Sequence, residues 1–110
     1  MKPAVFLGSA KEDMSAFPQA AKSRAGHELF MVQLGRAPDD WRPMKVVGPG
    51  AREIRVRSSE VAFRLIYVAV FESAVYVLHA FQKKAEHTSR GDIDMARRRY
   101  REAATLERME

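Results

Sequence analysis

The chain has 110 residues, a formal net charge of +5 and a sequence pI of about 9.9, and it contains no cysteine. The length fits one compact domain over residues 1–110, and the lack of cysteine excludes disulfides and thiolate metal sites. No apolar run approaches the ~20 residues of a membrane-spanning helix, so we expect a cytoplasmic protein with no membrane partner. The basic charge favours an acidic partner such as nucleic acid.

The N-terminal residues predict a short strand followed by a helix. Residues 3–8 (PAVFLG) are apolar and begin with proline, which is tolerated in a strand at or next to a sheet edge. Ser9 and Glu12 then have the spacing of a capping box, which marks the start of a helix.

A second helix is predicted over about residues 18–34. Pro18 suits its first turn, and Gly35 suits its end. Spacings of three and four residues give it one apolar stripe, formed by Ala21, Ala25, Leu29 and Val32. The two helices together predict a helical pair.

A loop and three strands are predicted next. Residues 36–50 contain three prolines and read as a loop. Residues 51–57 alternate between apolar and charged side chains, with Ile54 and Val56 on one face. Residues 61–71 are apolar on both faces apart from one arginine, which predicts a central strand. The last strand covers residues 74–81.

A final helix is predicted from Ser89, which can act as its N-cap with Asp92 three residues later. Its apolar stripe consists of Ile93, Ala96, Tyr100 and Ala103, and Arg97, Arg98, Arg99 and Arg101 surround the other faces. The predicted order is therefore β-α-α-β-β-β-α. We expect an α+β fold in which a helical pair packs on a small twisted antiparallel sheet, with a C-terminal helix.

The positive charge is concentrated in the predicted sheet. Residues 43–84 contain seven cations and three anions, which is +4 of the total +5. The sequence has no P-loop, no G-x-G-x-x-G and no H-E-x-x-H, and its three histidines lack metal-ligand spacing. We therefore expect no metal and no cofactor. An enzyme of this composition would act through cations, imidazole and backbone groups.

RNA cleavage is one reaction that such groups can catalyse, because the RNA 2′-OH attacks its own phosphate. The protein must align the backbone, move protons and stabilise the charge on phosphorus. Candidate catalytic residues are Arg55, Arg64, His79, Lys83 and Lys84, and candidate RNA-binding residues are Lys45, Arg57, Tyr67, Phe81, Arg97 and Arg98.

Each candidate also has a structural interpretation. Arg64 interrupts an apolar strand and needs a partner if it is buried, and Glu53 or Glu72 would serve. His79 shares strand parity with Val75, Val77 and Phe81, which is also the pattern of a core histidine. The cations on the strands have a solvated face or edge of the sheet as their structural alternative. The aromatic residues Tyr67, Phe81 and Trp41 have core packing as their alternative. Arg97 and Arg98 have a solvated helix face as theirs.

The segments EIRVR, FRLIYVAVF, VYVLHAFQKK and DIDMARRRY, together with FLGSAKEDMSAFP and APDDWRPMKVVG, resemble the phage-derived HigB-like branch of the RelE/ParE toxin superfamily. The resemblance spans about residues 4–104. It implies a RelE-like fold and the toxin of a type II toxin–antitoxin pair. Such a toxin is a ribosome-dependent, metal-independent mRNA endonuclease (mRNA interferase) that inhibits translation, with a helix-turn-helix antitoxin, the ribosome and mRNA as partners.

By position, the resemblance matches Arg64 to an arginine that the family carries on a strand. It matches Lys83 and Lys84 to the cations that the family places after its last strand. RelE-type proteins often place a tyrosine soon after those cations. Here no tyrosine precedes Tyr100, which leaves Tyr67 or His87 as substitutes. Two alternatives stay open, a non-catalytic ParE-like gyrase poison and an inactive basic RNA-binding module, because a fold does not fix a function.

Overall fold

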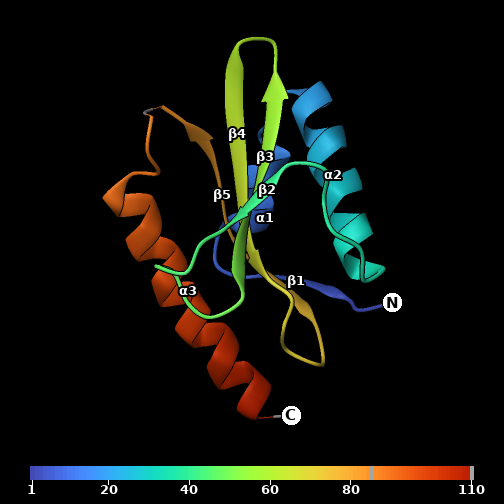
Figure 1. The fold of residues 1–110 in the computed structure, drawn as a ribbon, viewed down its shortest axis with the longest axis vertical. Helices are drawn as coiled ribbons and strands as arrows, with labels where there is room; N and C mark the ends of the chain where they lie inside the picture. The colour runs from blue at the N-terminus through green and yellow to red at the C-terminus, as the bar shows by residue number, and fades with distance from the viewer. Residues whose placement is uncertain (85, 110) are drawn as a thin grey trace.

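A five-stranded sheet with strand order β1-β5-β4-β3-β2 forms the centre of the fold (Figure 1). The computed structural model describes residues 1–84 and 86–109. In chain order the elements are β1 (Ala4–Phe6), α1 (Ala10–Ser15), α2 (Gln19–Gln33), β2 (Trp41–Pro43), β3 (Ala51–Ser58), β4 (Val61–Val68), β5 (Val75–Lys83) and α3 (Arg90–Arg108). Within the described residues, no helix is both long and apolar enough to cross a membrane.

The predicted helical pair packs on one face of the sheet. All four residues of the predicted stripe of α2, Ala21, Ala25, Leu29 and Val32, are buried in one apolar cluster. Side chains of β3, β4 and β5 complete this cluster, among them Ile54, Leu65 and Val77. Helix α2 ends as predicted, with Gly35 just beyond it at a φ of +85°.

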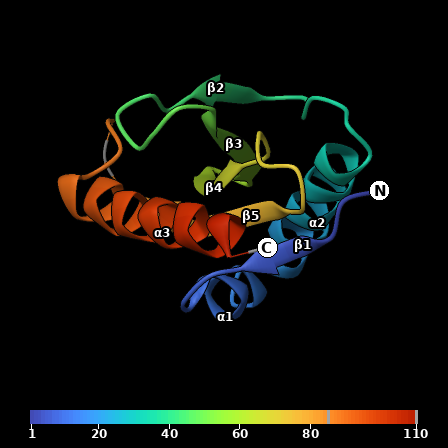
Figure 2. The ribbon, with the colours of Figure 1, turned by 90° about the horizontal axis from the view of Figure 1, so that it is seen from below.

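Helix α3 covers the opposite face, so helices lie on both sides of the sheet (Figure 2). Ala96 and Ala103 are fully buried there against residues such as Ile66 and Leu78. Ser89 caps α3 as predicted, because the Asp92 backbone N–H donates to Ser89 Oγ over 3.1 Å.

The sheet differs from the predicted one in two respects. The segment expected to be a loop contains an additional edge strand, β2, in which Trp41 pairs with Ile54 and Pro43 with Arg52. The sheet is also mixed, because β1 runs parallel to β5 at one edge while the other neighbours are antiparallel. A short edge strand tolerates the proline that favoured the loop prediction.

The predicted capping box at the start of α1 is wrong. Ser9 occupies the N-cap position, but its side chain makes no capping hydrogen bond. Its hydroxyl instead donates to Asp13 Oδ2 over 2.7 Å and accepts from Arg99 Nη2 over 3.2 Å.

Strand β5 contains a bulge that changes which side chains face α3. Ile66 pairs with His79, whereas the next residue, Tyr67, pairs with Val77, so Leu78 has no opposite partner in β4. Val77 lies in the core under α2, and beyond the bulge His79 lies on the α3 side, where it contacts Asp92. The prediction that His79 lies on the same face of the sheet as Val75 and Val77 is therefore wrong.

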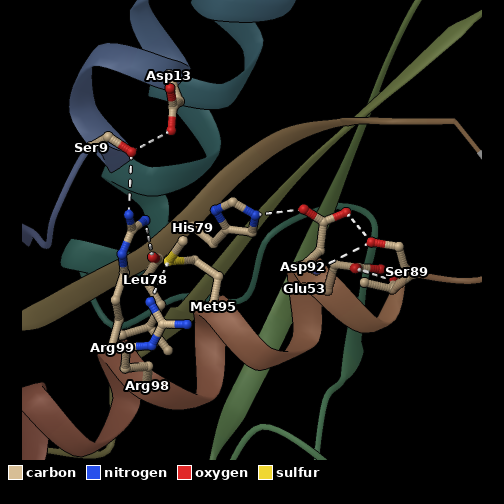
Figure 3. Close-up of polar contacts among 11 residues, drawn as sticks. Ser9, Asp13, Glu53, Leu78, His79, Ser89, Asp92, Met95, Arg98 and Arg99 are labelled. Atoms are coloured by element: carbon tan, nitrogen blue, oxygen red, sulfur yellow. Dashed lines mark hydrogen bonds and ion pairs between the residues drawn. The ribbon is translucent and has the colours of Figure 1, made fainter.

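Arg99 was expected on an exposed helix face but is buried, with 8% of its surface exposed. Its Nη1 donates to the Leu78 carbonyl oxygen over 3.0 Å, and its Nη2 donates to Ser9 Oγ. Arg99 thus ties α3 to the bulge in β5 and to the start of α1 (Figure 3).

We expect Arg99→Met to lower the free energy of unfolding by about 1–3 kcal/mol, because the buried Leu78 carbonyl oxygen and Ser9 Oγ lose their donor. Arg98→Met is the matched control on the same helix, since Arg98 is exposed, and it should change stability by less than about 0.5 kcal/mol. Urea denaturation of both variants measures this difference. Equal losses of stability would contradict the structural role of Arg99.

Candidate functional site

The sheet register aligns cations from neighbouring strands. Arg55 of β3 lies directly opposite Arg64 of β4, and Arg64 lies opposite Phe81 of β5. Alternate residues of a strand share a face, and Ile66 packs in the core beneath α3. Arg64 therefore projects from the α3 side of the sheet, and its two cross-strand partners lie on that side with it.

A second row lies nearer the tip of the β3–β4 hairpin. Arg57 is opposite Ala62, and Ala62 is opposite Lys83. The side chains of both rows and His79 form one surface, called the basic face below. It consists of Arg55, Arg57, Arg64, His79, Phe81 and Lys83.

A groove of about 480 Å³ opens at the outer end of the basic face and is called the basic groove. Four of its lining residues are the cations Arg57, Arg64, Lys83 and Lys84. Its remaining lining residues are Glu60, Val61, Ala62, Gln82 and Glu86. Three of these cations, Arg57, Arg64 and Lys83, lie on three neighbouring strands, and Lys84 directly follows β5.

Glu53 pairs with Arg64 beneath the basic face. Arg64 is buried, and its Nε lies 3.3 Å from Oε1 of Glu53, which is fully buried. Arg64 Nη1 also donates to the Phe63 carbonyl oxygen over 3.2 Å. Burial lowers the pKa of Arg64, and the Glu53 carboxylate opposes that change. Of the two predicted carboxylate partners, Glu53 is therefore the one found next to Arg64.

Two residues that the sequence did not single out complete this network. Arg42 Nε donates to Glu53 Oε1 over 3.0 Å, and Arg42 Nη2 donates to Thr88 Oγ1 over 3.0 Å. The Thr88 hydroxyl in turn donates to Glu53 Oε2 over 2.8 Å. Arg42 was missed because its strand, β2, was predicted to be a loop, and a lone threonine carries no sequence signal for such a contact.

The environment of Lys83 favours its neutral form. Partial burial and the neighbouring guanidinium groups of Arg64 and Arg42 lower the pKa of Lys83, while Glu53 acts in the opposite direction. A lysine whose pKa is lowered holds more neutral amine near neutral pH and can act as a base. Lys84, the next residue, is exposed.

Arg55 lies on the basic face but not among the residues that line the groove. Its Nη1 is 3.8 Å from Asp40 Oδ1, and its backbone N–H donates to the Asp40 carbonyl oxygen over 2.8 Å. Its Nε is buried without a hydrogen-bond partner among the described residues. The side chain is 39% exposed, so it adds positive charge beside Arg64.

His79 lies between the sheet and α3. Its Nε2–H donates to Asp92 Oδ1 over 2.7 Å (Figure 3). Its ring stacks on Phe81 with a centroid distance of 4.8 Å. Only 11% of its side chain is exposed, and it does not line the groove. This arrangement positions the Phe81 ring and α3 rather than presenting the imidazole to solvent.

Phe81 borders a smaller pocket of about 200 Å³ next to the basic groove. Lys83 and Lys84 line both hollows. The other residues that line the smaller pocket are Gln82, His87, Ser89 and Asp92. His87 thus lies near the cations, whereas the sequence offered it only as a substitute for a missing tyrosine.

Four predicted RNA-binding residues lie away from the groove. Tyr67 is on the α2 side of the sheet and only 1% exposed, so it has no ring face available for a base. Lys45 is exposed in the segment between β2 and β3, and Arg97 and Arg98 are exposed on α3, but none of the three lines the groove. Trp41 instead supports the Arg52 guanidinium, which lies 4.0 Å from its ring centroid.

In the part of the chain that the structure describes, no group of three or more histidine, aspartate or glutamate side chains is arranged to hold a metal ion.

Residues 12–101 match the model of the family described as phage-derived protein Gp49-like (DUF891). No curated protein matches the sequence.

Proposed function

Because the chain belongs to the Gp49-like family of phage-derived proteins, a RelE-type, toxin-like family, we propose that it is a toxin that cleaves mRNA on the ribosome. The proposed reaction is metal-independent and uses the 2′-OH of the RNA as its nucleophile. Expression of the protein would then stop translation through loss of intact mRNA.

The observation that supports this proposal most strongly is the basic groove. Arg57 of β3, Arg64 of β4, Lys83 of β5 and the following Lys84 line one hollow of about 480 Å³. RNA backbone carries one charge per phosphate, and a row of cations on a rigid sheet is suited to hold it in a fixed path. Phe81 lines the neighbouring pocket, where an unstacked base can contact an aromatic ring.

In the proposed reaction the neutral amine of Lys83 accepts the proton of the 2′-OH. The 2′ oxygen then attacks the adjacent phosphorus, and the bond from phosphorus to the 5′ oxygen of the next nucleotide breaks. The Lys84 ammonium donates a proton to that leaving oxygen, which gives a 2′,3′-cyclic phosphate and a 5′-hydroxyl. Arg64 and Arg57 neutralise the negative charge that develops on the phosphate.

His79 and Arg55 have supporting roles in this proposal. His79 holds Phe81 and Asp92 in place. Arg55 raises the positive potential next to Arg64. Both assignments follow from where the side chains lie, since neither residue lines the groove.

Membership of a toxin-like family indicates an antitoxin partner. We propose that this antitoxin is a small helix-turn-helix protein, as in HigB-like systems, and that ribosome and mRNA are the targets of the free toxin.

The test is induced expression together with purified ribosomes programmed with a defined mRNA. We expect growth arrest, new mRNA 5′ ends detected by primer extension, and cleavage in the presence of EDTA. DNA breaks with intact mRNA would favour gyrase as the target instead. Normal growth and uncut mRNA on ribosomes would refute the proposal.

A further inference from the structure

Glu53 is an acidic residue in an unusual position. It has no exposed surface, and it lies under the most basic part of the sheet. Taking a carboxylate out of water is unfavourable unless it is paired and hydrogen-bonded. Here the carboxylate contacts the guanidinium groups of Arg42 and Arg64 and the hydroxyl group of Thr88.

These contacts fix the geometry of Arg64. The Glu53 carboxylate forms an ion pair with Arg64 Nε over 3.3 Å, without a hydrogen bond, and the Phe63 carbonyl oxygen accepts from Nη1, while the same side chain lines the basic groove. An arginine held on two sides loses little rotamer freedom when it binds a phosphate, so its placement is set before RNA arrives.

The network also reaches the segment after β5. Thr88 donates to Glu53 and accepts from Arg42, and the next residue, Ser89, caps α3. Thr88 therefore joins the start of α3 to β3 and β2. Lys84 and His87 lie in the stretch between β5 and this anchor.

We infer that Glu53 is the positioning residue of the basic groove: it orients Arg64, keeps Arg42 beside it despite their like charge, and with Thr88 anchors the start of α3. This inference rests on the proposed function for its catalytic consequence. Its structural part concerns the free protein alone. Glu53 itself is not a catalytic residue, because it is fully buried and does not line the groove.

The carboxylate also affects Lys83. Among the charged groups around that amine, Arg64, Arg42 and Arg55 disfavour its protonated form, and Glu53 favours it. Other charged groups that line the same groove are Arg57, Glu60, Lys84 and Glu86. Removing the charge of Glu53 alone should therefore move the titration of Lys83 to lower pH.

The first experiment uses the free protein and the isosteric variant Glu53→Gln. NMR follows the titration of the Lys83 ammonium group and the hydrogen exchange of the Arg64 Nε–H group. We expect the acid dissociation constant of Lys83 to rise about threefold or more, and the Arg64 proton to exchange faster. Glu28→Gln is the matched control, because Glu28 is, among the described residues, the other nearly fully buried carboxylate, lies on α2 and contacts Arg24 and the Asp39 backbone N–H.

Thr88→Val and Thr88→Ser extend the test if Glu53→Gln folds poorly. Thr88→Val removes the hydroxyl at similar volume but keeps the Glu53 charge, so it should speed the exchange of the Arg64 proton without moving the Lys83 titration. Thr88→Ser keeps the hydroxyl and should resemble the wild type. If neither Glu53→Gln nor Thr88→Val changes the Lys83 titration or the Arg64 exchange relative to Glu28→Gln, the inference is wrong.

The second experiment measures mRNA cleavage on ribosomes. We expect Glu53→Gln to lower kcat about 10- to 100-fold with little change in KM, and to move the acidic limb of the pH–rate profile to lower pH. A loss of activity that matches only a loss of folded protein, with an unchanged pH profile, would contradict the positioning role. A wild-type protein that does not cut mRNA would refute the proposed function, while the NMR result would still decide the role of Glu53.

Discussion

Arg64→Ala should lower the rate of mRNA cleavage on the ribosome by about 100- to 1,000-fold, the usual effect of removing one group that stabilises transition-state charge. Arg64 is the central arginine of the basic face and lines the groove from β4. The variant should still fold, because Glu53 keeps its bonds to Arg42 and Thr88. We expect its free energy of unfolding to fall by about 1–3 kcal/mol. Single-turnover cleavage and urea denaturation of the same preparation measure the two effects.

Arg36→Ala provides the control for a general loss of positive charge, because Arg36 is exposed just beyond α2 and does not line the groove. It should change the cleavage rate by less than about threefold. If Arg64→Ala were folded and retained full activity, the groove would not be the catalytic site.

Lys83→Met should lower the cleavage rate by about 100- to 10,000-fold, which is the range for loss of a general base. The base must be neutral, so the wild-type rate should rise with pH until the Lys83 amine is fully deprotonated. Burial and the adjacent arginines lower the pKa of Lys83, so the midpoint of that rise should lie below the ordinary lysine pKa of about 10.4. The variant should show no such rise.

A pH–rate profile under single-turnover conditions measures this effect. Lys11→Met is the control, since Lys11 is exposed on α1. If the cleavage rate of Lys83→Met still rises with pH as the wild-type rate does, the general base is another group.

The parts of the fold that the sequence predicted correctly depend on local patterns. The apolar stripe of α2 is buried as expected. Ser89 and Asp92 mark the start of α3, as their spacing indicated. Strand β4, which is apolar on both faces apart from Arg64, is central in the sheet, as this pattern predicted. In each case the sequence pattern that predicts the helix or strand lies within a few residues of it.

The features that the sequence did not predict depend on distant partners. The strand β2 has three residues, and only its pairing with β3 makes it a strand. The bulge at Leu78 has no sequence signature, yet it moves His79 to the other face of the sheet. Arg99 looks like its exposed neighbours, and its burial depends on Ser9 and Leu78, which α3 reaches only in the folded chain.

The candidate site also combines properties that local sequence patterns predict with properties that depend on distant partners. The residue types and the strand on which each cation lies could be predicted. Whether the cations share a face depends on the register between strands, which a single sequence does not specify. The register then placed Arg55, Arg57, Arg64 and Lys83 together and excluded Tyr67.

The parallel pairing of β1 with β5 affects the order of events during folding. Ala4 pairs with Val75, so the first strand has no partner until most of the chain has been synthesised. The antiparallel strands β3, β4 and β5 are close in sequence and can pair earlier. Pairings between distant residues form slowly because they require closure of a long loop. We therefore expect the hairpins that carry Arg55, Arg64 and Lys83 to form first, and β1 to join the sheet in the last and slowest phase of folding.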